Sequence, residues 1–207
     1  MDYIAGLSSN DWGLWKTLNM NAEKVQGLSP ELQAGLKPLL EGMASLRAQI
    51  REYNQRIEPL AQTHYPQVAL LKQVKGEGTL VALTYRLTLE DARRFGKSRD
   101  VGCYVGLQPG RRNSGPSEPQ RHISKEGDRY LRTWLVPAAH PILGPFGADS
   151  DLRRWGLKLA ERGGKNGKKR AVIAVARKLS VLLHRLWVSG EVYEPLRNSS
   201  QPLSAAA

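Results

Sequence analysis

Seven apolar residues between positions 39 and 60 recur at alternating steps of four and three, and this heptad pattern limits the fold more than any other feature. They are Leu39, Met43, Leu46, Ile50, Tyr53, Ile57 and Leu60. On a helix this spacing places all seven along one seam, with charged residues such as Glu41, Arg47 and Glu52 outside it. We therefore expect a long helix over about residues 36–60, ended by Pro59 and Pro66.

The seam has two interpretations. Three heptads are enough to predict a coiled coil, formed either with a second chain or with a neighbouring helix. The same pattern also fits one amphipathic helix that packs on the core of its own chain. If the partner is a second copy of this chain, the protein forms a homo-oligomer whose interface is residues 39–60.

Positive charge is concentrated in the middle and late parts of the chain. The formal net charge is +12, from 31 Lys and Arg against 19 Asp and Glu. Residues 1–75 are nearly neutral, whereas residues 93–134 hold ten basic and four acidic residues, and residues 151–187 hold eleven and two. A chain this basic usually binds a polyanion, most often nucleic acid, although Lys and Arg can also merely solvate helix faces.

Composition argues against several other classes of protein. No apolar run approaches the ~18–20 residues that span a bilayer, and the N-terminus does not resemble a signal peptide. The single cysteine, Cys103, rules out a disulfide framework, and the four histidines lack the spacing of metal ligands. These features favour a cytoplasmic protein with no membrane partner.

Two short apolar helical patterns flank Lys75-Gly76-Glu77-Gly78 and together resemble a helix-hairpin-helix. In that motif the glycines let the hairpin backbone approach a DNA phosphate and offer its N–H groups. Gly76 and Gly78 are therefore candidate phosphate-binding positions. Glu77 stands where an apolar residue is usual and brings a negative charge near the phosphate, which argues against tight binding.

Residues 103–134 are the least regular stretch of the middle chain. Prolines and glycines break any helix there, and six cations surround the break: Arg111, Arg112, Arg121, Lys125, Arg129 and Arg132. Short strands are expected on either side, around residues 105–107 and 122–124. A helix then begins near Asp128 and runs through Leu135, with Pro137 and Pro141 limiting or kinking it.

The last third of the chain predicts two helices joined by a basic turn. The first helix covers about residues 150–162 and ends at Gly163 and Gly164. The second buries an apolar face between Val172 and Leu186 and ends at Gly190. The turn between them carries further candidate nucleic-acid-binding residues, namely Lys165, Lys168, Lys169 and Arg170.

Ser114 is the candidate nucleophile, in Arg111-Arg112-Asn113-Ser114-Gly115. A serine that attacks a phosphodiester needs an exposed loop, room for the phosphate, and cations that stabilise the pentacovalent transition state. Gly115 provides the room and the two arginines provide the cations. By residue type alone, however, turn formation is the better explanation of this segment.

Four motifs follow the order seen in one known family. They are Gly106-Leu107-x-Pro109, Ser114-Gly115, Ile123-Ser124-Lys125-x-Gly127-Asp128-x-Tyr130-Leu131-Arg132, and Lys168-Lys169-x-Ala171-x-x-Ala174-Val175-Ala176-Arg177-Lys178-Leu179. From about Val68 to Pro195 the chain resembles the C-terminal transposase domain of the insertion-sequence-110 family, the Piv/MooV-type DEDD recombinases. The heptad helix resembles the coiled-coil segment that precedes this domain.

This resemblance implies DNA transposition by cleavage and strand exchange, guided by a bridge RNA that pairs with donor and target DNA. It also implies a prokaryotic, nucleoid-associated protein. It assigns to Ser114 the covalent link to DNA. In the family a separate N-terminal RuvC-like domain supplies four acidic residues that bind magnesium. Residues 1–65 are too few to build that fold, so we expect a C-terminal part that lacks the RuvC-like domain and holds no cofactor of its own.

The expected fold is mainly α: a coiled-coil helix, then a helical domain with a helix-hairpin-helix-like element and a small β/loop insertion that carries the serine. We expect an N-terminal segment over residues 1–66, the transposase domain over 67–196 and a disordered tail over 197–207. The expected function is a serine-type DNA transposase or recombinase domain that is inactive alone. The alternative is a non-catalytic DNA- or RNA-binding module that self-associates through a coiled coil.

Overall fold

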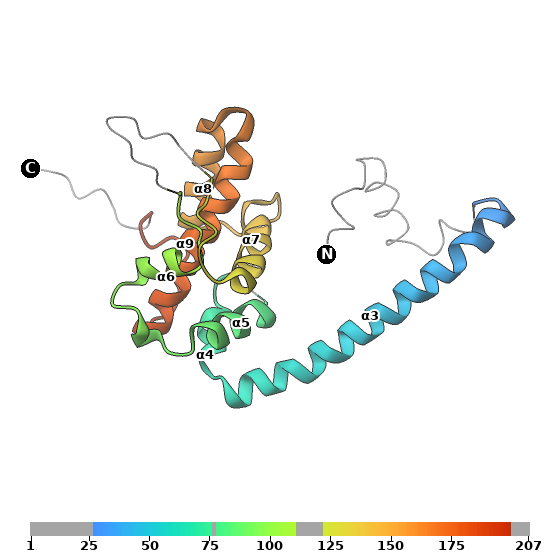
Figure 1. The fold of residues 1–207 in the computed structure, drawn as a ribbon, viewed down its shortest axis with the longest axis horizontal. Coiled ribbons are helices and arrows are strands. Elements are labelled where there is room, and N and C mark those ends of the chain that lie inside the picture. The colour runs from blue at the N-terminus through green and yellow to red at the C-terminus, as the bar shows by residue number, and fades with distance from the viewer. Residues whose placement is uncertain (1–26, 76–77, 111–121, 200–207) are drawn as a thin grey trace, which may run out of the picture. The chain divides into compact units, whose positions relative to one another are not determined.

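The computed structural model describes residues 27–75, 78–110 and 122–199. These residues form seven α-helices, two short 3-10 helices and an isolated β-bridge, without a β-strand, so the expectation of a mainly α fold is confirmed (Figure 1). The chain divides into two compact units, Met1–Gln55 and Arg56–Ala207, and the division falls inside the long helix α3.

Helix α3 spans Pro30–His64 and is longer at both ends than expected. Our expectation that Pro59 ends the helix is wrong, because Pro59 lies inside it. A proline removes the hydrogen bond that the carbonyl four residues earlier would accept, here that of Gln55. The helix continues because its last turns are anchored: Ala61 is fully buried, and the Glu58 carboxylate accepts hydrogen bonds from Lys72 and from the Thr79 hydroxyl.

The heptad seam of α3 is exposed. Five of its seven residues expose 54 to 64% of their surface, namely Leu39, Leu46, Ile50, Tyr53 and Leu60. Met43 and Ile57 are half-buried. Within the described residues, the hydrophobic core takes only Ala61 from this helix. The described core therefore does not use the seam.

Helix α9 (Gly167–Ser189) is the central element of the second unit. It packs against α4 (Gln67–Leu71), α6 (Ser98–Tyr104), α7 (Arg129–Leu143) and α8 (Asp151–Arg162), while α5 (Thr79–Leu89) packs on α4 and α7. Its predicted apolar face is confirmed, with Val175, Ala176, Leu179, Leu183 and Leu186 buried and Val172 and Leu182 half-buried. The predicted cap is also confirmed, since Gly190 ends the helix with a φ of +67°.

Buried polar side chains fix the position of α9. The Tyr85 hydroxyl donates to the Ser180 carbonyl over 2.5 Å, and burial raises the pKa of Tyr85 well above its ordinary value. His184 is 1% exposed; its Nδ1 lies 2.9 Å from the Ser98 hydroxyl and its Nε2 lies 2.9 Å from the Ala92 carbonyl. Because a carbonyl only accepts, Nε2 carries a proton. Both ring nitrogens are thus satisfied, and α9 is bound to α6 and to the 3-10 helix Ala92–Arg94.

Helix α7 runs through both prolines that we expected to limit it. Pro137 and Pro141 lie inside the helix, which continues to Leu143. Both are exposed, as is Thr133, whose carbonyl loses its helical donor to Pro137. Backbone groups on an exposed helix face can bind water instead. The prolines therefore interrupt hydrogen bonding only on the outer side, while Leu131, Leu135 and Ile142 still pack into the core.

Candidate functional site

Two backbone segments pair immediately before and after residues 111–121. The N–H of Gly110 donates to the His122 carbonyl over 2.8 Å, and the N–H of Ser124 donates to the Gln108 carbonyl over 2.8 Å. These residues surround an antiparallel bridge between Pro109 and Ile123, which takes the place of the two short strands that we expected. We call residues 104–110 and 122–128 the stem. It brings the chain back to the point from which segment 111–121 departs.

Further backbone hydrogen bonds join the two halves of the stem. The Asp128 N–H donates to the Tyr104 carbonyl over 2.9 Å, and the Lys125 N–H donates to the Gly106 carbonyl over 3.1 Å. Glycine is required at position 127, where the two halves of the stem approach each other closely. A Cβ on Gly127 would lie 2.1 Å from the Tyr104 carbonyl oxygen. Leu107 is 2% exposed and anchors the first half of the stem in the core.

Helix α7 begins directly after the stem and braces it. The Asp128 carboxylate caps the helix by accepting from the Leu131 N–H at 2.6 Å. Arg132 is half-buried, and its guanidinium donates to the Val105 carbonyl over 2.8 Å. We predicted Arg132 as a nucleic-acid-binding residue, and sequence reasoning missed this contact because the position of Val105 depends on the tertiary fold.

Several predicted site residues lie outside the described residues. These are Ser114, Arg111, Arg112, Arg121 and Gly76. Among the others, Lys125 and Arg129 are exposed at the second half of the stem and the start of α7. Gly78 is exposed at the N-terminus of α5, with open space where a Cβ would stand.

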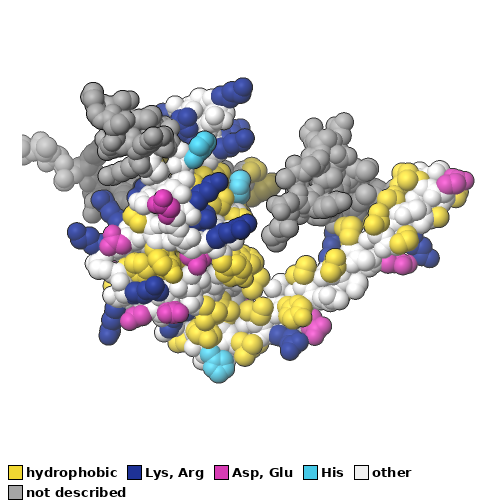
Figure 2. All heavy atoms as spheres, viewed as in Figure 1, with side chains coloured by type: hydrophobic (Ala, Val, Ile, Leu, Met, Phe, Trp, Pro, Cys, Tyr) yellow, Lys and Arg dark blue, Asp and Glu magenta, His cyan; other side chains and the backbone are white. Residues whose placement is uncertain are grey.

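A cluster of cations covers the end of the α8–α9 hairpin. Figure 2 shows Lys and Arg side chains gathered there. Lys165 lies in the 3-10 helix Gly164–Asn166 and the others lie in the first turn of α9; we call Lys165, Lys168, Lys169 and Arg170 the basic turn, and all four are exposed. The predicted end of α8 at Gly163 is confirmed. Gly167 allows the close helix approach, since a Cβ there would lie 2.2 Å from the Ala160 carbonyl oxygen.

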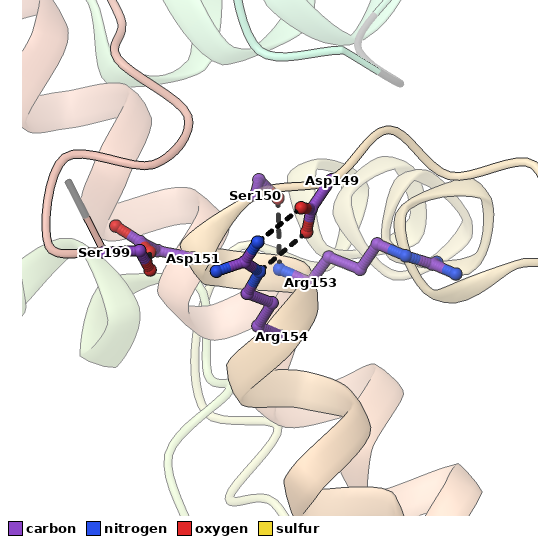
Figure 3. A network of polar contacts seen from close by, with 6 residues as sticks. All are labelled: Asp149, Ser150, Asp151, Arg153, Arg154 and Ser199. Atoms are coloured by element: carbon purple, nitrogen blue, oxygen red, sulfur yellow. Dashed lines mark hydrogen bonds and ion pairs between the residues drawn. The ribbon is translucent and has the colours of Figure 1, made fainter.

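A polar network surrounds the start of α8 (Figure 3). Asp149 forms two hydrogen bonds with the Arg154 guanidinium, at 2.9 and 2.6 Å, and these hold the pKa of Asp149 below its ordinary value. The Ser150 hydroxyl caps the helix at the Arg153 N–H, over 3.1 Å. The Arg153 guanidinium donates to the carbonyls of Ile142 and Gly144, at the end of α7. The sequence patterns did not single out this network.

The same network holds part of the expected tail. The Asp151 carboxylate accepts from the Ser199 hydroxyl over 2.6 Å and from the Asn198 N–H over 2.8 Å, and these contacts lower its pKa. The segment that we expected to be disordered from residue 197 is therefore attached to α8 as far as Ser199, because Asp151 offers two acceptor oxygens to it.

These carboxylates serve structure rather than metal binding. In residues 27–75, 78–110 and 122–199, no group of three or more His, Cys, Asp or Glu side chains could hold a metal ion. Near the stem, Asp128 already caps α7. The described residues thus do not fit magnesium, and we assign no step to a metal on them.

None of the described helices is long and apolar enough to cross a membrane.

The described residues define a class of protein: a basic helical domain with a hydrogen-bonded stem on either side of segment 111–121 in the sequence and with an exposed basic turn between α8 and α9. Residues 68–147 match the family model "Transposase IS116/IS110/IS902 family". This match confirms, for residues 68–147, the family resemblance that the sequence motifs predicted.

Named relatives agree with this assignment. The chain is 29% identical over 173 residues to "Transposase for insertion sequence element IS1111A" of Coxiella burnetii, covering 83% of this chain and 46% of that protein. It is 29% identical over 164 residues to "Probable family 20 transposase" of Pseudomonas aeruginosa, covering 77% and 46%. "Transposase for insertion sequence element IS1328" of Yersinia enterocolitica is 36% identical over 69 residues, covering 33% and 21%. The chain spans about half the length of the first two relatives.

Proposed function

We propose that this chain acts in DNA transposition as the nucleic-acid-binding, serine-bearing part of a transposase, with its domain over residues 67–196. The family match carries the proposal, because residues 68–147 include the stem and the whole of segment 111–121. Further support comes from the order of the motifs on both sides of that segment.

The proposed nucleophile is Ser114. Its Oγ attacks the phosphorus of a DNA phosphodiester and forms a new P–O bond, while the P–O bond to the sugar oxygen on one side of the cleavage point breaks. The departing oxygen takes up a proton and becomes a hydroxyl. The serine proton passes to a base. Arg111 and Arg112 are the proposed partners of the phosphate. A separate acidic, magnesium-binding domain completes the site, and covalent capture of DNA on the chain in its presence tests the assignment. Without Ser114 reactivity, the chain is a non-catalytic DNA- or RNA-binding module.

Nucleic acid binding is proposed to run mainly through phosphates. The exposed basic turn supports this, together with Arg121, Lys125 and Arg129 near the stem and the glycine hairpin at Gly76 and Gly78. Both DNA and a guide RNA present the required phosphates. Contacts of this kind carry no base information, so they position the nucleic acid without selecting a sequence.

Affinity for DNA should therefore fall steeply with salt. We expect Lys168→Gln to weaken binding to all DNA sequences to the same extent. The plot of log K against log salt concentration should also become less steep, its slope decreasing in magnitude by about 1. Lys37→Gln on α3 is the matched control, with the same loss of charge and no expected effect. Fluorescence anisotropy titrations between low and physiological salt measure both. An affinity that does not change with salt would contradict phosphate binding.

The exposed seam of α3 is proposed to mediate self-association. Leu46 and Ile50, at 60% and 58% exposure, would be buried by a second copy of the helix. Replacing both with glutamate places charges inside the seam and should dissociate a dimer. Ser45→Glu with Ala48→Glu adds the same charge at outer positions of the same helix and should leave the dimer intact. Analytical ultracentrifugation gives the result; a monomeric unmutated chain would contradict the coiled coil.

A further inference from the structure

The outer face of α7 presents residues that the fold does not use. Tyr130, Thr133, Pro137, His140 and Pro141 are exposed. At helical spacing they share one side with Arg129 and the half-buried Trp134, and we call these seven residues the outer face of α7. The buried residues Leu131, Leu135, Ala138, Ala139 and Ile142 lie on the opposite side. On the side of the molecule drawn in Figure 2, hydrophobic side chains gather over α5 and α7.

The centre of this face is an aromatic pair. Tyr130 is 62% exposed, and its ring meets the ring of Trp134 one helical turn later, with centroids 6.3 Å apart and planes at 78°. This edge-to-face contact supports the tyrosine ring without covering it. Exposed aromatic rings held in place in this way typically mark a binding surface, because water solvates them poorly.

The charge around the pair favours an anionic ligand. Helix α7 contains Arg129 and Arg132 and no Asp or Glu. The carboxylate of Asp128, just before the helix, is engaged in its cap. Glu126 is the nearest remaining acid in the sequence, and it precedes the helix in the stem. A ligand that fits has negative charge next to flat apolar faces, which is the chemistry of a nucleotide.

We propose that the outer face of α7 binds unpaired nucleotides: bases stack on Tyr130 and Trp134, and Arg129 contacts a phosphate. The inference rests on the proposed nucleic-acid function and adds the kind of strand that is bound. In a duplex the bases stack on one another and offer no free face to a side chain, whereas an unpaired strand does. A second copy of this chain fits less well, because it would bring its own Arg129 against the same charge on this face.

The test measures binding of the full 207-residue chain to fluorescent oligonucleotides of equal length. The probes are single-stranded DNA, single-stranded RNA, a duplex, and an abasic strand that keeps the phosphates but lacks the bases. We expect Tyr130→Ala to weaken binding to the single strands by about tenfold and to leave duplex and abasic binding unchanged. Tyr130→Phe keeps the ring and should bind like the unmutated chain. The single strand, RNA or DNA, for which Tyr130→Ala loses more affinity identifies which nucleic acid supplies the unpaired strand.

Controls separate this proposal from the proposed function. Leu87→Ala, at a 47% exposed residue of α5, is the matched apolar control and should have no effect. Trp134→Leu tests the second ring, and unchanged thermal melting of each variant shows that the fold is retained. If the unmutated chain binds none of the probes, the nucleic-acid function itself fails.

Other outcomes overturn the stacking proposal alone. If the unmutated chain binds but Tyr130→Ala and Trp134→Leu bind single strands equally well, the face is not a stacking surface. Equal losses on abasic and normal strands would assign these rings a purely structural role. A change of mass in solution on Tyr130→Ala, with unaltered binding, would assign the face to contact between copies.

Discussion

Covalent attachment of DNA to this chain is expected to disappear completely when Ser114 is replaced by alanine. The substitution removes the one oxygen that we propose as nucleophile, and the methyl group of alanine cannot attack phosphorus in its place. A denaturing gel that retains labelled DNA on the protein measures the product, with the acidic domain supplied. Thermal stability should barely change, because the substitution removes a single oxygen from a serine.

Two controls make the Ser114 result specific. Ser117→Ala removes the same group three positions later and should retain covalent capture. If Ser114→Ala still captures DNA, Ser117 and Ser124 are the next serines to test. The chain alone, with magnesium and supercoiled DNA, should bind without nicking, since phosphoryl transfer needs both the attacking and the leaving oxygen stabilised. Covalent capture by Ser114→Ala would move the nucleophile elsewhere, and nicking by the chain alone would show a complete active site.

The second large effect is expected from Gly127→Ala in the stem. Its new Cβ would stand 2.1 Å from the Tyr104 carbonyl oxygen and 2.7 Å from the Gly106 nitrogen, and both neighbours are backbone atoms that cannot rotate away. We expect a loss of about 2–3 kcal/mol in the free energy of unfolding, typical of overpacking, or local opening of the stem. If the free energy of unfolding is reduced, the melting temperature should fall by on the order of 5–10 °C.

Amide hydrogen exchange distinguishes the two responses to Gly127→Ala. Local opening would speed exchange at the N–H groups of Gly110 and Ser124 while the amides of α9 stay protected. Gly96→Ala is the matched control, because its Cβ meets no atom within 4 Å. Unchanged melting and unchanged exchange in Gly127→Ala would contradict the close crossing of the stem.

The helices were predictable because their signals are local. The apolar face of α9 follows from spacing alone, and its end follows from Gly190, which adopts the positive φ expected of a helix cap. The helices continue through Pro59, Pro137 and Pro141 for one common reason. Proline opposes helix locally, but the burial of Ala61, Leu131 and Leu135 on the inner faces outweighs a hydrogen bond lost elsewhere.

The candidate site was predictable only in part. Motif order and charge singled out the segment around Ser114 and the basic turn. The hydrogen bond from Arg132 to Val105 joins residues 27 positions apart in the sequence. The hydrogen bond from Ser199 to Asp151 joins residues 48 positions apart. No periodicity in the sequence encodes such pairs, since they arise only when the helices pack.

The hydrogen bond between Gly110 and His122 also limits how strongly the length of segment 111–121 affects the stability of the fold. The stem already brings the ends of segment 111–121 together, so the fold does not depend on the number of residues that join them. The entropy of closing a flexible loop grows slowly, by about 0.6 kcal/mol for each doubling of its length. The helical scaffold should therefore tolerate changes in the length of segment 111–121, so that the segment can be altered by engineering separately from the fold that carries it.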